Sequence, residues 1–205
     1  MIALLVLGVS AAFIERFETL DKWIPSTATK EGVDADLAKY NGKWRLDDGL
    51  VLDSVAAHSA ISTVFAPVDP KDNDLVVQYM VNPTKGLDCG GAYLKIFSHK
   101  PAFKPEQMTD KTPYTIMFGP DKCGGSDKVH FIFRHQNPVS KQVEEKHLAA
   151  TPPSQLAAGQ TNLYTLAVFR NQTFEILINN NSVKTGSLLE AFEPPVNPEK
   201  GHLHI

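Results

Sequence analysis

Side chains suited to binding a polar ligand are concentrated between Cys89 and Cys123, the two cysteines of the chain. Side chains alternate across a strand, so Tyr93 and Lys95 share one face of the stretch that follows the pair Gly90-Gly91. A glycine pair beside an aromatic face lets a ligand approach the backbone closely. The pattern predicts a ligand site here, although an ordinary hairpin whose tyrosines cover a core fits it as well.

A second strand pattern occupies residues 114–118, where larger apolar side chains alternate with Thr115 and Met117. The pair Gly119-Pro120 is typical of a turn, and we expect it to end this strand. Two cysteines are too few for a zinc site made of thiolates alone, and the sequence contains no CxxC redox motif.

Length and composition exclude several classes of protein. A chain of 205 residues with 42% hydrophobic residues suits one soluble globular domain with a sizeable core. A net charge of −3 provides no basic surface field, so nucleic acid is not an expected partner. After the N-terminus, no stretch approaches the roughly 18 uninterrupted apolar residues of a membrane span.

The elements that must position these side chains are short strands. Patterns of alternating or β-branched residues recur at roughly 8- to 12-residue spacing, with turn residues between them and almost no helical periodicity. This spacing predicts an all-β sandwich. The expected strands lie at residues 13–23, 40–45, 49–52, 58–65, 75–81, 91–97, 114–118, 128–135, 142–147, 163–169 and 174–178.

The N-terminus has the features of a targeting segment. Residues 2–12 are apolar and end on small residues, which is typical of a signal-peptide core with cleavage near Ala12. A buried first strand is the alternative. A signal peptide would place the chain where disulfides form.

Four motifs resemble one family. They are CGGAYLK at residues 89–95, KTPYTIMFGPDKCG at 111–124, HFIFRHQNP at 130–138 and EEKH at 144–147. Together they resemble the luminal lectin domain of calnexin and calreticulin, glycoprotein chaperones of the endoplasmic reticulum. The motif sequences look closer to calnexin. The resemblance implies a concanavalin A-like jelly-roll β-sandwich over residues 13–198, after a signal peptide at 1–12 and before a terminal tail at 199–205.

In this family a proline-rich arm, the P-domain, follows, and later strands and a helix return to the lectin domain. We therefore expect the sandwich to be incomplete at its C-terminal side. The resemblance also implies that one carboxylate of the sugar site comes from that later segment. Without it, we expect glycan affinity about 10- to 150-fold weaker than in a complete family member.

The resemblance carries a sugar site onto this chain residue by residue. An aromatic ring covers the C–H face of a sugar, while charged side chains bind its hydroxyls strongly. The matching positions are Tyr93, Lys95, Tyr114, Met117, Asp121 and Glu145.

Two further features follow from the resemblance. Cys89 and Cys123 match the family's disulfide. The family's structural calcium ion matches the Arg16 backbone carbonyl and the turn Asp47-Asp48, which offer the oxygen ligands that Ca²⁺ prefers. An ordinary acidic turn remains the alternative for these last residues.

The resemblance implies a non-enzymatic chaperone module of the endoplasmic reticulum lumen, with calcium-dependent stability. Its partners would be monoglucosylated glycoproteins and unfolded luminal proteins. One alternative is a sandwich-fold glycoside hydrolase with Asp121 and Glu145 as its paired carboxylates. The sequence lacks the Glu-x-Asp-x-x-Glu pattern of sandwich glucanases, which favours the lectin. Another alternative is a truncated fragment that binds no glycan.

Two glycosylation sequons also occur, Asn171-Gln172-Thr173 and Asn180-Asn181-Ser182, whereas Pro83 blocks a third at Asn82. Both lie in predicted turns, so both asparagines should be exposed if the chain is luminal.

Overall fold

The computed structural model describes residues 13–29 and 39–196. The expected signal peptide at 1–12 and the tail at 199–205 lie outside the described residues. The chain forms two compact units. The N-terminal unit comprises Met1–Val68 and His99–Thr112, and the sandwich unit comprises Asp69–Ser98 and Pro113–Ile205.

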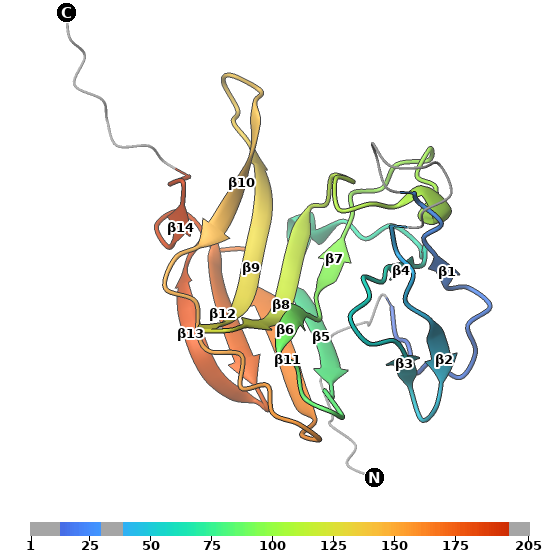
Figure 1. Ribbon diagram of the computed structural model, residues 1–205. Coiled ribbons are helices and arrows are strands. Elements are labelled where there is room, and N and C mark those ends of the chain that lie inside the picture. The colour runs from blue at the N-terminus through green and yellow to red at the C-terminus, as the bar shows by residue number, and fades with distance from the viewer. Residues whose placement is uncertain (1–12, 30–38, 197–205) are drawn as a thin grey trace, which may run out of the picture. The chain divides into compact units, whose positions relative to one another are not determined.

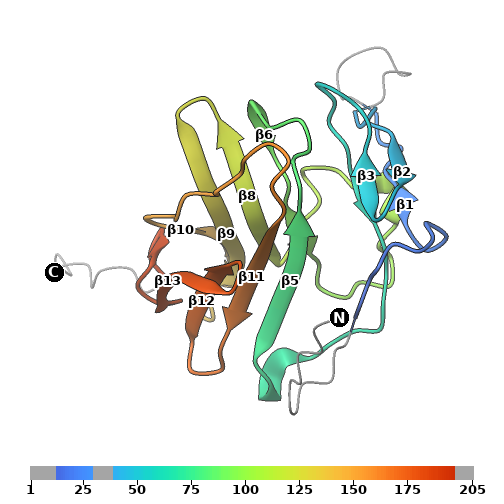
Figure 2. The ribbon, with the colours of Figure 1, turned by 90° about the horizontal axis from the view of Figure 1, so that it is seen from below.

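The sandwich unit contains two antiparallel sheets, which Figures 1 and 2 show as separate layers. The larger sheet has the order β14-β10-β9-β8-β6, and β7 also pairs with β8. Its strands are β6 (Cys89–Gly91), β7 (Leu94–Ile96), β8 (Ile116–Cys123), β9 (Ser126–Gln136), β10 (Val143–Leu148) and β14 (Phe192–Glu193). The smaller sheet has the order β13-β12-β11-β5. Its strands are β5 (Leu75–Val81), β11 (Asn162–Val168), β12 (Thr173–Ile178) and β13 (Asn181–Ser187), and a 3₁₀ turn, η1 (Pro70–Asp72), precedes β5.

The core lies between the two sheets. Alternate residues of each strand point inward, as the period of two requires. Phe118 and Phe131 of the larger sheet and Phe174 of the smaller sheet are almost fully buried in one apolar cluster, with Phe131 and Phe174 edge to face. Each such side chain stabilises the fold by about 1.5–3 kcal/mol. The all-β sandwich expected from the strand spacing is confirmed.

One strand is longer than the sequence predicted. β8 continues through Gly119 and Pro120 to Cys123, although this pair was expected to end it. Proline cannot donate the ladder hydrogen bond that would complete the pairing with Ala92. The Tyr79 hydroxyl donates instead to the Ala92 carbonyl at 2.7 Å, while the Ala92 N–H donates to the Pro120 carbonyl at 3.0 Å.

Glycine is required at position 119 for this arrangement. Its φ is +140°, and a Cβ there would lie 1.9 Å from the Tyr79 hydroxyl and 2.8 Å from the Ala92 carbonyl oxygen. Burial raises the pKa of Tyr79, so its hydroxyl stays protonated as a donor. The tyrosine and the glycine together let a proline occupy the middle of a strand.

Strand β5, expected at residues 75–81, lies at the edge of the smaller sheet. Only its inner face packs on the core. Val76 and Met80 on its outer face are exposed, because no further layer covers them among the described residues of this unit.

The N-terminal unit contains two small antiparallel sheets. They pair β1 (Ile24–Pro25) with β4 (Ile61–Ser62) and β2 (Trp44–Leu46) with β3 (Leu50–Leu52), and a 3₁₀ turn, η2 (Pro105–Gln107), completes the unit. None of the described helical segments is long and apolar enough to cross a bilayer.

The strand expected at residues 13–23 does not form. The backbone turns at Phe17, whose φ is +57°, and Glu15 anchors the turn by accepting a hydrogen bond from the Trp23 indole at 2.8 Å. This hydrogen bond, with those from Lys22 and the Phe17 amide, lowers the pKa of Glu15 to about 2. Phe17 and Trp23 contact each other and are only half-buried.

Candidate carbohydrate-binding site

The residues expected to contact sugar lie over the outer face of the larger sheet. Lys95, Met117, Ile132 and His147 are direct neighbours in a row across β7, β8, β9 and β10. Their sequence neighbours Phe118 and Phe131 point into the core, so alternation directs this row outward.

At one end of this face, Tyr93, Asp121 and His130 form a group that we call the Asp121 cluster. The Tyr93 hydroxyl donates a hydrogen bond to the Asp121 carboxylate. His130 Nε2 lies 3.5 Å from the same carboxylate oxygen, and its ring meets the Tyr93 ring edge to face. Burial, and then the hydrogen bond and charge of Asp121, raise the pKa of Tyr93. Burial also lowers the pKa of His130, with Lys128 acting in the same direction and Asp121 opposing it.

The disulfide sets the register beside this cluster. Cys89 and Cys123 form the disulfide and are direct partners between β6 and β8. Two residues further along, Gly91 lies opposite Asp121.

The space beside Gly91 is filled by a side chain of the protein, where the sequence predicted the approach of a ligand. A Cβ at this position would lie 2.1 Å from the Tyr93 ring. Tyr93 itself therefore packs across Gly91, where a ligand was expected to approach the backbone.

At the other end, Tyr114, Glu145 and His147 form a group that we call the Glu145 cluster. Burial, followed by a hydrogen bond to the Glu145 carboxylate, raises the pKa of Tyr114. His147 Nε2 lies 3.4 Å from Glu145, and the Lys95 ammonium lies 4.8 Å from the centre of the Tyr114 ring. Each cluster thus combines a tyrosine, a carboxylate and a histidine.

The two carboxylates are far apart along the sheet. Asp121 lies opposite Lys128 of β9, and Glu145 lies opposite Arg134 of the same strand. From 128 to 134 there are six residue steps, or about 20 Å at roughly 3.3 Å per residue. Met117 and the buried Ile132 lie between them.

This separation argues against the glycoside hydrolase. Paired carboxylates of such enzymes are about 5–9.5 Å apart. Asp121 and Glu145 cannot reach that distance from backbone positions about 20 Å apart along the strands. The face resembles an extended binding strip more than a catalytic centre.

Several residues of this face were not among the predicted contacts. His130, Ile132 and Arg134 share one face of β9, and His147 follows Glu145 by two residues on β10. The alternation of residues 128–135 and of the EEKH motif contained the signal, because it places these side chains beside predicted site residues.

The predicted calcium residues lie in the N-terminal unit. Arg16, Asp47 and Asp48 line one open hollow together with Glu18. Asp47 is already paired with Arg45, whose guanidinium nitrogen lies 2.7 Å from its carboxylate.

Calcium takes six to eight oxygen ligands. Within residues 13–29 and 39–196, no group of three or more His, Cys, Asp or Glu side chains is arranged to hold a metal. The residue types therefore fit calcium, and the described residues supply only part of a coordination shell.

Comparisons with known proteins find similar sequences along nearly the whole chain. The model of the Calreticulin family matches residues 13–202. A calnexin homolog of Aspergillus fumigatus is 48% identical over 94% of this chain and 37% of its own length. A calmegin of Bos taurus is 45% identical over 92% of this chain and 34% of its own length. The chain thus spans little more than a third of these relatives.

The fold agrees as well. The solved T. cruzi calreticulin globular domain matches with a TM-score of 0.73 and 28% identity, covering 88% of this chain and 67% of that one. This likeness confirms the jelly-roll β-sandwich expected from the sequence. The chain belongs to the Calreticulin family.

Proposed function

We propose that this chain is a non-catalytic lectin module of an endoplasmic reticulum chaperone. It binds monoglucosylated N-linked glycans on folding glycoproteins, and it acts in the lumen. The observation that supports this most is the shared sheet face, over which Tyr93, Lys95, Tyr114, Met117, Asp121 and Glu145 all lie.

The Asp121 cluster supplies a preorganised acceptor for sugar hydroxyls. Tyr93 and His130 hold the Asp121 carboxylate from two sides, so its remaining lone pairs point in a fixed direction. A hydrogen bond to a charged group is worth about 1.5–3 kcal/mol. Terminal glucose, the group that distinguishes the glycan, is assigned to this cluster.

The rest of the face suits the following sugars. Met117 provides an apolar side chain for C–H faces, and Lys95 and Glu145 offer charged partners for hydroxyls. A strip about 20 Å long is longer than one sugar ring, which favours an oligosaccharide over a single glucose.

The proposed calcium site lies in the N-terminal unit. The Arg16 carbonyl and the carboxylates of Asp47 and Asp48 would hold the ion, which would tie residue 16 to the turn at 47–48. Asp47 must exchange its pairing with Arg45 for this role. The expected consequence is higher thermal stability with calcium than with a chelator.

Calorimetric titration with a monoglucosylated oligomannose glycan tests the function. We expect saturable binding that is lost for the same glycan without its terminal glucose. Tyr93→Ala and Lys95→Ala should weaken binding at least tenfold, whereas Met80→Ala on the smaller sheet should not. Binding unchanged in the first two variants would place the site elsewhere, absence of binding would favour a non-binding fragment, and glycan cleavage would favour a hydrolase.

A further inference from the structure

The turn between β11 and β12 has a geometry that its sequon alone does not convey. The Gln172 N–H donates to the Phe169 carbonyl at 2.9 Å, and the Phe169 N–H donates to the Thr173 carbonyl at 2.9 Å. Gln172 has a φ of +64°. The turn is also held from outside, because the Arg170 N–H donates to Asp74 at 3.0 Å. Residues 169, 171 and 173 are thereby fixed around one tight bend.

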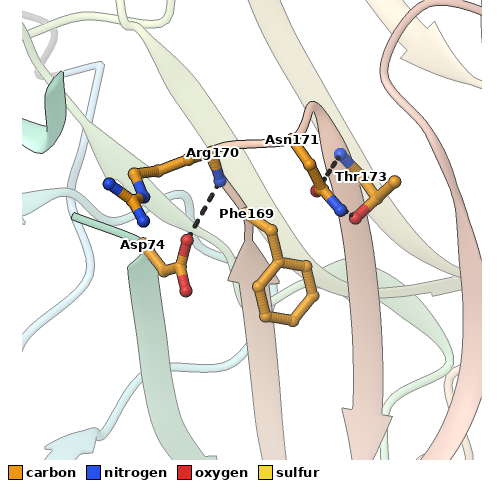
Figure 3. A pocket seen from close by; sticks show the side chains of 5 residues that line it. All are labelled: Asp74, Phe169, Arg170, Asn171 and Thr173. Carbon is orange, nitrogen blue, oxygen red and sulfur yellow. Dashed lines mark hydrogen bonds between the residues drawn. The ribbon is translucent and has the colours of Figure 1, made fainter. Parts of the chain in front are cut away.

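Asn171 has its amide oxygen occupied and its amide nitrogen accessible. Its Oδ1 accepts hydrogen bonds from the Thr173 N–H at 3.2 Å and the Thr173 hydroxyl at 2.6 Å (Figure 3). Its Nδ2 donates no hydrogen bond to any residue in the described parts of the chain. The residue is exposed, which confirms the expectation for this sequon.

An open hollow lies beside this asparagine. Asp74, Phe169, Arg170, Asn171 and Thr173 line it (Figure 3). Phe169 is half-buried and does not belong to the apolar core cluster, although its neighbour Val168 packs against that cluster. An aromatic ring outside the core is available to pack against a ligand, and the C–H face of a sugar is a suitable partner.

We propose that Asn171 carries an N-linked glycan whose first sugar packs in this hollow against Phe169 and Thr173, and that this contact stabilises the sandwich unit. The proposal rests on the luminal location in the proposed function, because the glycan donor is a lipid-diphosphate-linked oligosaccharide. Asn171 Nδ2 forms a bond to the anomeric carbon of the first sugar. The bond from that carbon to the diphosphate oxygen breaks, the diphosphate leaves with the electron pair, and the amide nitrogen releases one proton.

The second sequon provides an internal contrast. Asn180 is also exposed, so the structure agrees with that expectation too. Two residues before it stands Ile178, which is buried in the core, where Asn171 has Phe169. A glycan on Asn180 would therefore have no aromatic partner at the equivalent position, and we expect it to add no stability.

A blocked sequon provides the control for glycosylation itself. Asn82 is exposed and is followed by Pro83 and Thr84. Pro83→Ala removes the block. This variant should gain a glycan wherever the chain meets the transfer machinery.

The test uses the full chain expressed through a eukaryotic secretory pathway. Peptide-N-glycosidase digestion in ¹⁸O-water, followed by mass spectrometry, should find Asn171 converted to ¹⁸O-labelled aspartate. Asn171→Asp is the matched control, because it has the same covalent structure as the digested protein and keeps an oxygen to accept from Thr173. We expect the glycosylated protein to melt about 2–4 °C above this variant, and to fall to its value after digestion.

Two further measurements test whether the higher melting temperature comes from the contact of the first sugar with Phe169 or from the presence of a glycan alone. Trimming the glycan to its first sugar should preserve the higher melting temperature. In Phe169→Ala the site should still be modified, but the melting difference between glycosylated and digested protein should disappear. A difference that persists in Phe169→Ala would overturn the packing.

An unmodified Asn171 beside a modified site in Pro83→Ala would overturn this proposal and leave the luminal function standing. No modification at any site, Asn82 in Pro83→Ala included, would contradict both, because the chain would then not meet the luminal machinery.

Discussion

The Asp121 cluster and the Glu145 cluster each contain a tyrosine, a carboxylate and a histidine, but their carboxylates and histidines differ in exposure. The side chains of Asp121 and His130 are 17% and 18% exposed, whereas those of Glu145 and His147 are 42% and 52% exposed. Burial strengthens hydrogen bonds to a charge and lowers screening by salt. We therefore expect the exposure of these side chains, more than their residue types, to decide which cluster contributes more to glycan affinity.

The Asp121 cluster is also held in place by more neighbouring structure than the Glu145 cluster. The disulfide joins β6 to β8 two residues after Asp121, and Tyr79 fills the space at Gly119, two residues before Asp121. The Glu145 carboxylate lies on β10, beyond β9 from these supports. We therefore expect perturbations of β6 and β8 to act on the first cluster and to spare the second.

Loss of the disulfide should have the largest effect. Closing a loop with a sequence separation of 34 stabilises by about 4 kcal/mol in the chain-entropy model. We expect the double variant Cys89→Ser, Cys123→Ser to lose about that much free energy of unfolding in urea. A loss below about 1 kcal/mol would mean that β6 pairs with β8 without this constraint.

Gly119→Ala should have the next largest effect, a loss of about 3 kcal/mol in the free energy of unfolding. The new methyl group would overlap the Tyr79 hydroxyl and the Ala92 carbonyl, and the backbone conformation would be strained. Gly124→Ala is the control, because it also has a positive φ but no atom within 4 Å of its Cβ. It should cost only about 1 kcal/mol. Equal effects in urea unfolding would remove the role assigned to Tyr79.

Glycan affinity should separate the two carboxylates. Asp121→Asn removes a half-buried charged acceptor, so we expect a loss of about 10- to 150-fold by calorimetry. Glu145→Gln removes an exposed one, for which about 0.2–1 kcal/mol corresponds to a loss of less than roughly fivefold. The reverse order would show that the more exposed carboxylate dominates.

The smallest effect should be a pH dependence of stability that arises from His130 in the Asp121 cluster. The pKa of His130 is lower in the folded protein than its ordinary value of about 6.5, because it is buried near Lys128. The unfolded chain therefore binds a proton first, and stability should fall as pH decreases below about 6.5 toward the folded pKa.

Thermal melts between pH 7.5 and pH 5 check this. His130→Gln should remove most of the dependence, whereas His147→Gln, which takes away a charge that also lowers the pKa of His130, should reduce it less. A dependence that survives His130→Gln would assign it to another group.

Much of this architecture could be predicted from the sequence, because alternation and turn residues act locally. Strands such as β9 and β12 followed directly from their pattern. The continuation of β8 did not, because the partner that compensates for Pro120 is Tyr79, about 40 positions earlier in the chain. The irregular stretch at residues 13–23 was missed for a similar reason, since one hydrogen bond between Glu15 and Trp23 replaces the strand.

The site shows the same limit. Motif resemblance predicted six positions but not that four of them belong to two separate clusters, because that depends on register across β9. Lys146 within the EEKH motif is an example. It points inward and is almost fully buried, and its ammonium donates to Glu144 at 2.8 Å and to the Pro195 carbonyl at 3.1 Å. Charge alone would have placed it on the surface.

The central claim is that a glycan binds across the outer face of the larger sheet, and methionine methyl NMR tests it most directly. Of the four methionines, Met117 lies between the two clusters, and Met80 lies exposed on the outer face of the smaller sheet. On titration with a monoglucosylated oligomannose glycan, the Met117 methyl signal should shift and saturate with the calorimetric Kd, while the Met80 signal stays in place. A shift of Met80 without a shift of Met117 would contradict the account.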